Sequence, residues 1–129
     1  MNDPEFVVDA SAALAALKNE RFDQIEPERI VRALISAVNF SEVLTKLHDD
    51  GLTETQADAA VSRLDLRVIA FDEEHARTAA QLRTSTRHVG LSLGDRACLA
   101  LAMTLGCAAV TADRIWAGLD IGVNVILIR

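Results

Sequence analysis

The segment Phe6 to Leu17, FVVDASAALAAL, joins a short apolar run to an Ala- and Leu-rich run through a single aspartate. The large apolar residues at its start predict a buried strand, and the residues from Ser11 to Leu17 predict a helix. Asp9 lies where the strand gives way to the helix, which is a position where an aspartate can cap a helix. This order of strand, acid and helix is the first unit of an alternating α/β chain.

The same order recurs along the rest of the chain. The predicted strands are Phe6 to Val8, Arg32 to Val38, Leu66 to Phe71, Ala108 to Thr111 and Val123 to Ile128. The predicted helices are Ser11 to Leu17, Glu20 to Glu26, Asn39 to Asp49, Thr53 to Leu64, Asp72 to Arg83 and Ser92 to Leu105, with a helical turn at Ile115 to Ala117 and a loop from Thr84 to Leu91. Strands that alternate with helices imply a parallel sheet covered on both faces. We therefore expect one α/β domain over residues 1–129, a three-layer α/β/α sandwich with about five mostly parallel strands.

Helix starts are marked by local capping patterns. Thr53 with Gln56 forms one capping-box pattern, and Asn39 with Glu42 forms another. Asn39 is therefore expected to cap its helix, and Pro27 is expected to end the helix before it.

The composition is that of an ordinary globular protein, with 129 residues that are 50% hydrophobic and 25% charged. No stretch has the roughly 20 apolar residues that cross a bilayer, and the acidic start does not resemble a secretory signal, so cytoplasmic residence is the expectation. Cys98 and Cys107 lie in or beside apolar runs and are expected to be buried thiols. The net charge of −6 argues against tight, non-specific binding to long duplexes, because phosphate backbones favour basic surfaces.

Acidic residues fall at the ends of predicted strands or in the first turns of predicted helices: Asp9, Glu42, Asp95 and Asp113. In an alternating α/β chain such points gather at the carboxyl edge of the sheet. Carboxylates brought together there repel one another and lose hydration unless a hard cation binds between them. The pattern predicts a Mg²⁺ or Mn²⁺ site with Asp9, Asp95 and Asp113 as ligands and Glu42 holding a water or a second ion. Ser11 and Thr111, each two residues from an acid, are candidate supporting hydroxyls.

Each acid also has a purely structural interpretation. Asp9 and Asp113 can cap the helical segments that follow them, and Glu42 fits the third position of a capping box. Asp95 lies in the first turn of its helix, where the helix dipole favours a negative charge. Gly94 beside it would let another group approach closely. Capping alone would still place a negative pocket at one sheet edge, which favours the metal-site hypothesis.

Taken together, these residues resemble the PIN domain, specifically the VapC-type toxin ribonucleases of toxin–antitoxin pairs. The likeness covers nearly the whole chain and rests on Val7-Val8-Asp9-Ala10-Ser11, Asn39-Phe40-Ser41-Glu42-Val43, Leu93-Gly94-Asp95-Arg96 and Val110-Thr111-Ala112-Asp113, followed by Arg114-Ile115-Trp116. The resemblance implies a metal-dependent endoribonuclease with Asp9, Glu42, Asp95 and Asp113 as its acidic quartet. It further implies a homodimer and a cognate antitoxin whose C-terminal segment occupies the cleft. Candidate contacts to RNA phosphates are Arg83, Arg87, His88, Arg96 and Arg114, although each also fits a solvated surface charge.

Other functions fit the residues less well. A phosphatase with an aspartate nucleophile usually has a second acid two residues after it, but two residues after Asp9 this chain has Ser11. A receiver-like, Mg²⁺-binding module has a pair of acids after the first strand and a Lys after the last strand. Here Asp9 is followed by Ala10, and the residue after the last strand is Arg129. A degenerate protein-binding domain is disfavoured by the intact quartet. The segment Ala12 to Leu17 and the helix from Thr53 could serve as partner surfaces or as internal packing.

Overall fold

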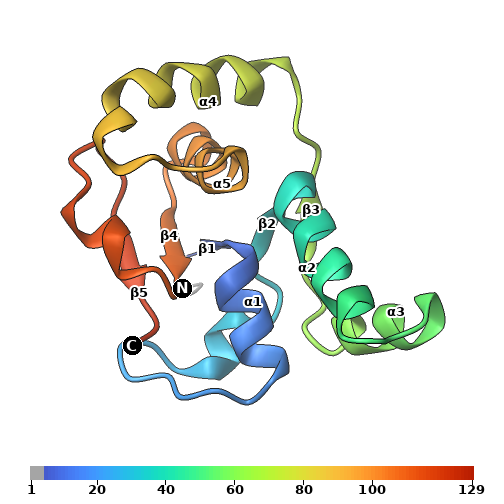
Figure 1. The fold of residues 1–129 in the computed structure, drawn as a ribbon. Coiled ribbons are helices and arrows are strands. Elements are labelled where there is room, and N and C mark those ends of the chain that lie inside the picture. The colour runs from blue at the N-terminus through green and yellow to red at the C-terminus, as the bar shows by residue number, and fades with distance from the viewer. Residues whose placement is uncertain (1–4) are drawn as a thin grey trace.

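The computed structural model describes residues 5–129 and contains one five-stranded parallel sheet between layers of helices (Figure 1). The strands are β1 (Phe6–Val8), β2 (Leu34–Ser36), β3 (Arg67–Ile69), β4 (Ala108–Thr111) and β5 (Val125–Leu127). The α-helices are α1 (Ala10–Leu17), α2 (Ala37–Asp49), α3 (Glu54–Ser62), α4 (Glu73–Ser85) and α5 (Leu93–Leu105). The short 3₁₀ helices are η1 (Pro27–Ile30), η2 (Arg87–Val89) and η3 (Arg114–Gly118). The predicted α/β/α architecture is confirmed.

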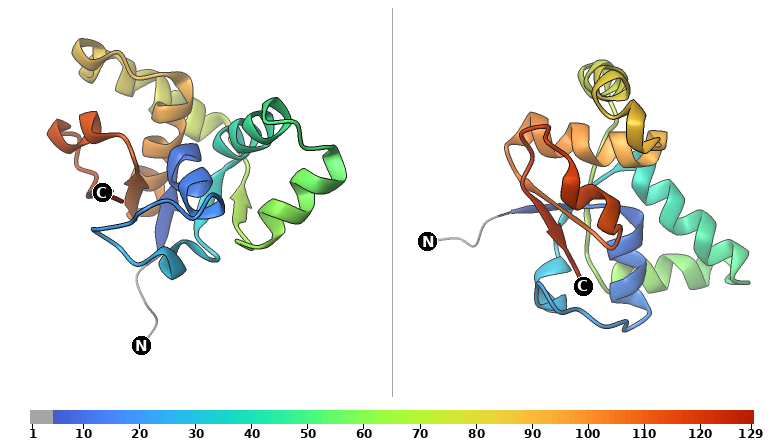
Figure 2. Two further views of the ribbon diagram at one scale, coloured as in Figure 1. Left: turned by 60° about the horizontal axis from the view of Figure 1, so that its bottom comes forward. Right: turned by 60° about the vertical axis from the view of Figure 1, so that its left-hand side comes forward.

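The two faces of the sheet carry separate hydrophobic cores because neighbouring strand residues point to opposite faces. Val8, Ile35 and Val110 pack with residues of α1, α2 and α3. Val7, Leu34 and Ala109 pack on the other face with residues of α4, α5 and η3, including Trp116. Figure 2 shows from two further sides that α4 lies outside α5, farther from the sheet. Both faces are thereby covered, as the apolar strands require.

The strand order β3-β2-β1-β4-β5 places the topological switch point between β1 and β4. From β1 the chain first builds the sheet in one direction, through β2 and β3, and then returns to add β4 on the other side. Val8 at the end of β1 pairs with Val110 of β4, so Asp9 and Thr111 emerge side by side at the carboxyl edge. Open α/β sheets bind ligands at such a switch point.

The helix predicted at Glu20 to Glu26 does not form. The backbone N–H groups of Asp23 and Gln24 instead donate to the carbonyl of Ile128, just beyond β5. Pro27 begins η1 rather than ending a helix, which is a favourable place for a residue that has no N–H to donate. A contact with a residue far along the chain therefore replaces the local helical bonds.

The junction between β2 and α2 also differs from the prediction. Arg32 has a left-handed backbone with φ of 64°, and the strand starts only at Leu34. Ser36 caps α2 by accepting a hydrogen bond from Val38 N, so the helix begins at Ala37 and the predicted Asn39 cap is wrong. The predicted loop at 84–91 is partly helical, because α4 continues to Ser85 and η2 follows it.

Several local signals are confirmed. Thr53 and Gln56 form the predicted capping box, Asp72 caps α4, and Gly106 ends α5 with a left-handed backbone. The apolar faces of α1 and α3 are used for internal packing. Both cysteines are free thiols, and Cys98 is buried as predicted. The prediction of a buried thiol is wrong for Cys107, which is half-buried because it lines a cavity at the amino end of β4. Within residues 5–129 no helix has the length and apolar character needed to traverse a bilayer.

Candidate active site

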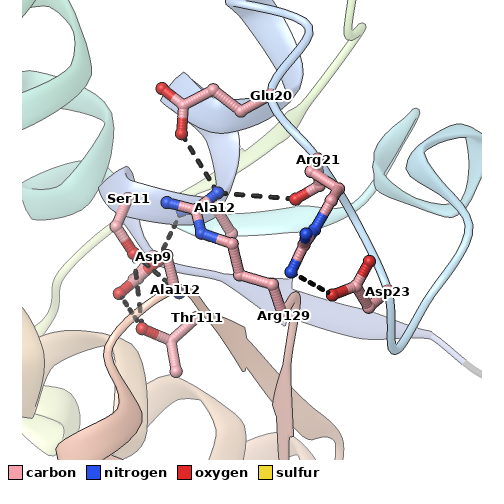
Figure 3. Close-up of polar contacts among 9 residues, drawn as sticks. All are labelled: Asp9, Ser11, Ala12, Glu20, Arg21, Asp23, Thr111, Ala112 and Arg129. Carbon is pink, nitrogen blue, oxygen red and sulfur yellow. Dashed lines mark hydrogen bonds and ion pairs between the residues drawn. The ribbon is translucent and has the colours of Figure 1, made fainter.

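Asp9 occupies the switch point as the residue between β1 and α1, where it caps α1. Its Oδ1 accepts hydrogen bonds from Ser11 Oγ at 2.7 Å and from Ala12 N at 2.9 Å, and its Oδ2 accepts one from Thr111 Oγ1 at 2.6 Å (Figure 3). Only 5% of Asp9 is exposed. Burial raises the pKa of Asp9 from 3.8 to about 6; its hydrogen bonds oppose the rise, and the charge of Asp95 adds to it. Ionised Asp9 therefore lies in an environment that disfavours its charge.

The hydroxyls of Ser11 and Thr111 fix the Asp9 carboxylate from two sides (Figure 3). Each hydroxyl has one proton, and each donates it to Asp9. As acceptors, Ser11 Oγ receives Ala112 N at 2.9 Å and Thr111 Oγ1 receives Asp113 N at 3.0 Å. The end of β1 is thus tied to the end of β4 through side chains that also orient Asp9.

Glu42 reaches the same edge from α2 and lies against the start of α5. Its Oε1 accepts a hydrogen bond from Asn39 Nδ2 at 3.0 Å, and the same nitrogen donates to Gly94 O at 2.9 Å. A Cβ at position 94 would overlap both carboxylate oxygens of Glu42, so the glycine is required for this approach. Glu42 does not take part in a capping box, because Ser36 is the helix cap.

Asp95 lies in the first turn of α5 and forms a capping box with Ser92. Its Oδ2 accepts a hydrogen bond from Ser92 N at 2.9 Å, and Ser92 Oγ accepts one from Asp95 N at 3.1 Å. The buried thiol of Cys98 lies one turn further along α5. Burial raises the pKa of Cys98, and the charges of Asp9, Asp95 and Glu42 add to the rise. The charges of these three carboxylates therefore act on the same buried thiol.

Asp113 is placed less centrally. Its Oδ1 accepts a hydrogen bond from Ile115 N at 3.0 Å and so caps η3. It is linked to Asp9 through Thr111, which accepts from the backbone of Asp113 and donates to Asp9. Asp9, Asp95 and Glu42 thus all act on the buried thiol of Cys98, and Asp113 is linked to Asp9 through Thr111.

The donor chemistry of this edge suits a hard divalent cation. Among residues 5–129, none of the salt bridges involves Asp9, Glu42, Asp95 or Asp113, so their charges have no cationic side-chain partner. Carboxylate oxygens are the ligands that Mg²⁺ prefers. Yet no three His, Cys, Asp or Glu side chains in this part of the chain are close enough to hold one ion as they stand. The residue types are those that bind a hard cation, although as they stand the described side chains form no three-ligand cluster.

Comparison with known proteins identifies the family. A model of the PIN domain matches residues 6–121. The chain belongs to the PIN-domain family. A search of curated protein sequences gives no match.

Solved structures share the fold of this PIN domain. A DNA-bound VapBC from Salmonella typhimurium is 20% identical over 95% of this chain and 97% of that chain, with a TM-score of 0.74. VapBC-5 from Mycobacterium tuberculosis is 24% identical over 98% and 99%, with a TM-score of 0.67. VapC20 from the same organism, described as a Sarcin-Ricin loop cleaving toxin, is 21% identical over 93% and 99%, with a TM-score of 0.65. At these identities the likeness shows the fold, and the structural neighbours are VapC toxins of toxin–antitoxin complexes.

The predicted RNA contacts of this PIN domain occupy different environments. Arg83 at the end of α4, Arg87 and His88 in η2, and Arg114 in η3 are exposed. Arg96 instead lies half-buried between helices, where its Nη1 donates to Ala79 O of α4 at 2.9 Å. Arg96 thus links α5 to α4, and its contact with RNA stays a prediction.

Asn39 is the site residue whose role the sequence did not reveal. Its place beside a capping pattern made it resemble a helix cap, whereas the structure buries it between Glu42 and Gly94. The available signal was its spacing, because residues three apart on a helix face one another. A separate cavity of about 650 Å³ is lined by Glu5, Met103 and Ala108 among others and lies at the amino ends of β1 and β4. None of the four predicted site acids lines it.

Proposed function

We propose that this PIN domain is a metal-dependent endoribonuclease that hydrolyses RNA phosphodiester bonds and serves as the toxin of a toxin–antitoxin pair. The observation that supports the proposal is the Asp9 carboxylate, held by Ser11 and Thr111 at the switch point of the sheet. Glu42 is held at the same edge, against the turn of α5 that carries Asp95. PIN domains are typically nucleases, and the fold is shared with a toxin described as cleaving the Sarcin-Ricin loop.

In the proposed site Asp9, Asp95 and Asp113 hold Mg²⁺ or Mn²⁺, and Glu42 orients a water or completes a second metal site. When bound, the metal would lower the pKa of a coordinated water and stabilise charge on the leaving oxygen. The raised pKa of Asp9 supports this role, because a nearby divalent charge would favour the ionised carboxylate that burial opposes.

The remaining residues prepare the site for this chemistry. Ser11 and Thr111 hold the Asp9 carboxylate in one orientation, so it does not need to reorganise when a metal or substrate arrives. Asp95 keeps one oxygen on the backbone of Ser92, and its other oxygen accepts no hydrogen bond from the described residues.

Binding of RNA is proposed to use Arg83, Arg87, Arg96 and Arg114. Arg83, Arg87 and Arg114 are exposed and form no salt bridge with another described residue. Replacing Arg87 by Ala should weaken RNA binding and reduce the slope of log affinity against log salt by about 1, since one phosphate contact is lost. An unchanged salt slope in fluorescence anisotropy would remove Arg87 from the binding surface.

Partner proteins belong to the same proposal. The neighbours from Salmonella typhimurium and Klebsiella pneumoniae were crystallised as a DNA-bound VapBC and as a toxin–antitoxin complex. For this chain we expect a homodimer and a cognate antitoxin whose C-terminal segment occupies the acidic edge. A species of monomer mass in light scattering at micromolar concentration would contradict the homodimer.

Cleavage of total cellular RNA by the purified protein tests the activity. Wild type, Asp95→Asn and the control Asp58→Asn should be compared in Mn²⁺ and in EDTA. Asn keeps the size of the side chain and an oxygen for Ser92 N, so Asp95→Asn should fold while its rate falls roughly 100-fold or more. Asp58→Asn removes the same charge from an exposed position on α3 and should cleave like wild type. Metal-independent fragments, or wild-type rates in Asp95→Asn, would refute the proposal.

The main alternative is a Mg²⁺-binding module without nuclease activity. Its receiver-like form is disfavoured, because flavodoxin-like sheets have the order 2-1-3-4-5 and this sheet has the order 3-2-1-4-5. Folded protein that binds Mn²⁺ and leaves every RNA intact would favour a binding module.

A further inference from the structure

We propose that Asn39 is a positioning residue that holds Glu42 in its working orientation, an inference that rests on the proposed function. Asn39 lies in the first turn of α2, three residues before Glu42. Its side-chain amide donates to Glu42 Oε1 at 3.0 Å and to the backbone oxygen of Gly94 at 2.9 Å. One buried amide nitrogen therefore ties the Glu42 carboxylate to the turn of α5 that carries Asp95.

The orientation of this amide is determined by its partners. Both protons of Nδ2 are used, and both partners are acceptors. Rotating the amide by 180° would place Oδ1 against two oxygens, so repulsion between these atoms fixes the orientation. Asn39 thus recognises a carboxylate and a carbonyl at the same time, as a hydrogen-bond donor only.

Stability alone does not account for an asparagine at this position. The residue is 1% exposed, and its Oδ1 has no hydrogen-bond partner among the described residues. A buried acceptor left unpaired is unfavourable, and an apolar side chain would avoid that cost. What the asparagine supplies, and an apolar side chain cannot, is the pair of bonds from Nδ2.

Gly94 leaves space on α5 for the Glu42 carboxylate. A Cβ at this position would overlap the carboxylate, so the carboxylate occupies the space that the glycine leaves beside α5. Glu42 is otherwise exposed, and a glutamate side chain freed from its partners regains many rotamers. Loss of Asn39 should therefore release the Glu42 carboxylate toward solvent.

The test combines substitutions at Asn39 and Glu42. Asn39→Ala, Glu42→Ala and the double variant are compared with wild type in Mn²⁺ affinity, by electron paramagnetic resonance, and in single-turnover RNA cleavage. Asn39→Ala should lower the Mn²⁺ affinity and the cleavage rate by roughly 10- to 100-fold each. This is the range found when a residue that hydrogen-bonds to a metal ligand is removed. The double variant should bind Mn²⁺ and cleave RNA as well as Glu42→Ala does, because the asparagine acts on the site through the glutamate carboxylate.

Leu47→Ala is the matched control, because Leu47 is 5% exposed on the same helix and makes no polar contact with Glu42. It should lower the melting temperature and leave Mn²⁺ affinity unchanged. If Asn39→Ala fails to fold, Asn39→Leu fills the same volume without the two donors. The inference would be overturned if the fold-losses of the two single variants multiplied in the double variant. It would also be overturned if the single variants at Asn39 bound Mn²⁺ with wild-type affinity.

The two proposals fail in different ways. A wild-type protein that binds Mn²⁺ and cleaves no RNA would refute the proposed function, while the Mn²⁺ titrations would still decide whether Asn39 acts through Glu42. A wild-type protein without Mn²⁺ binding would overturn both.

Discussion

Replacing Asp9 by Asn should stabilise the metal-free protein at neutral and alkaline pH. The carboxylate is buried, and burial raises its pKa from 3.8 to about 6. The folded protein therefore binds this proton more tightly than the unfolded chain does. Between these two pKa values the folded state carries more protons, so the Asp9 contribution to stability falls as the pH rises through that window.

The size of the effect follows from the shift. With these folded and unfolded pKa values, the buried Asp9 charge lowers the free energy of unfolding by about 3 kcal/mol at pH 8 and by about 1 kcal/mol at pH 4.5. Asn removes the charge and retains an oxygen that can cap α1. The free energy of unfolding of the variant should exceed that of wild type by about 3 kcal/mol at pH 8, which is about 10 °C in melting temperature. At pH 4.5 the difference should shrink to about 1 kcal/mol.

Urea unfolding in EDTA at the two pH values measures this difference directly. Comparing the variant with wild type at each pH cancels the titration of the other carboxylates. Asp58→Asn, which removes an exposed charge from α3, should show no comparable gain. Equal stability of wild type and Asp9→Asn at pH 8, or an advantage that does not change with pH, would refute the assignment of a buried, costly charge.

Divalent metal should narrow the stability difference between Asp9→Asn and wild type. A divalent cation that binds the folded site stabilises it by mass action, by about 2.7 kcal/mol at one hundred times its dissociation constant. Mg²⁺ should therefore stabilise wild type more than Asp9→Asn, because the variant has lost one proposed ligand.

Two further substitutions test the geometry around Asp9 and Glu42. Gly94→Ala should lower the rate of RNA cleavage roughly 10-fold or more by displacing Glu42, with little change in melting temperature, whereas Gly118→Ala, where a Cβ meets no atom within 4 Å, should cleave normally. Thr111→Val should destabilise the protein by about 1–3 kcal/mol in chemical denaturation, since Asp9 Oδ2 and Asp113 N lose a buried partner. A Thr111→Val protein as stable as wild type would show that these bonds contribute little.

Local signals in the sequence were enough to predict most of the fold. The capping box of Thr53 and Gln56, the Asp72 cap and the glycine end of α5 depend on residues within one or two turns. Such short-range chemistry is visible in the sequence. Together with the apolar runs, it predicts the alternation of strands and helices and hence the layered architecture.

The errors occurred where distant residues decide the structure. The segment at 20–26 gives backbone donors to Ile128, more than one hundred residues later, and so forms no helix. Asn39 begins a capping pattern, but β2 ends at Ser36, which caps the helix first. Local patterns could not show either contact, because both depend on where the sheet places the chain.

The sequence predicted which sheet edge carries the acids, but it did not predict their individual contacts. Acids that follow the strands of a parallel sheet lie at its carboxyl edge, where Asp9 caps α1 and Glu42 lies against the turn of α5 that carries Asp95. The sequence could not show that Asp9 is buried between two hydroxyls or that Asp113 turns to cap η3. These details depend on pairings across the switch point between β1 and β4.

The most direct test of the central claim is to measure RNA cleavage and Mn²⁺ binding in the same samples of wild type and Asp95→Asn across a Mn²⁺ titration. In wild type the cleavage rate should rise with occupancy of the bound ion, and folded Asp95→Asn should lose both binding and cleavage. Cleavage that proceeds without bound Mn²⁺, or that persists in Asp95→Asn, would contradict a metal-dependent ribonuclease at this edge of the sheet.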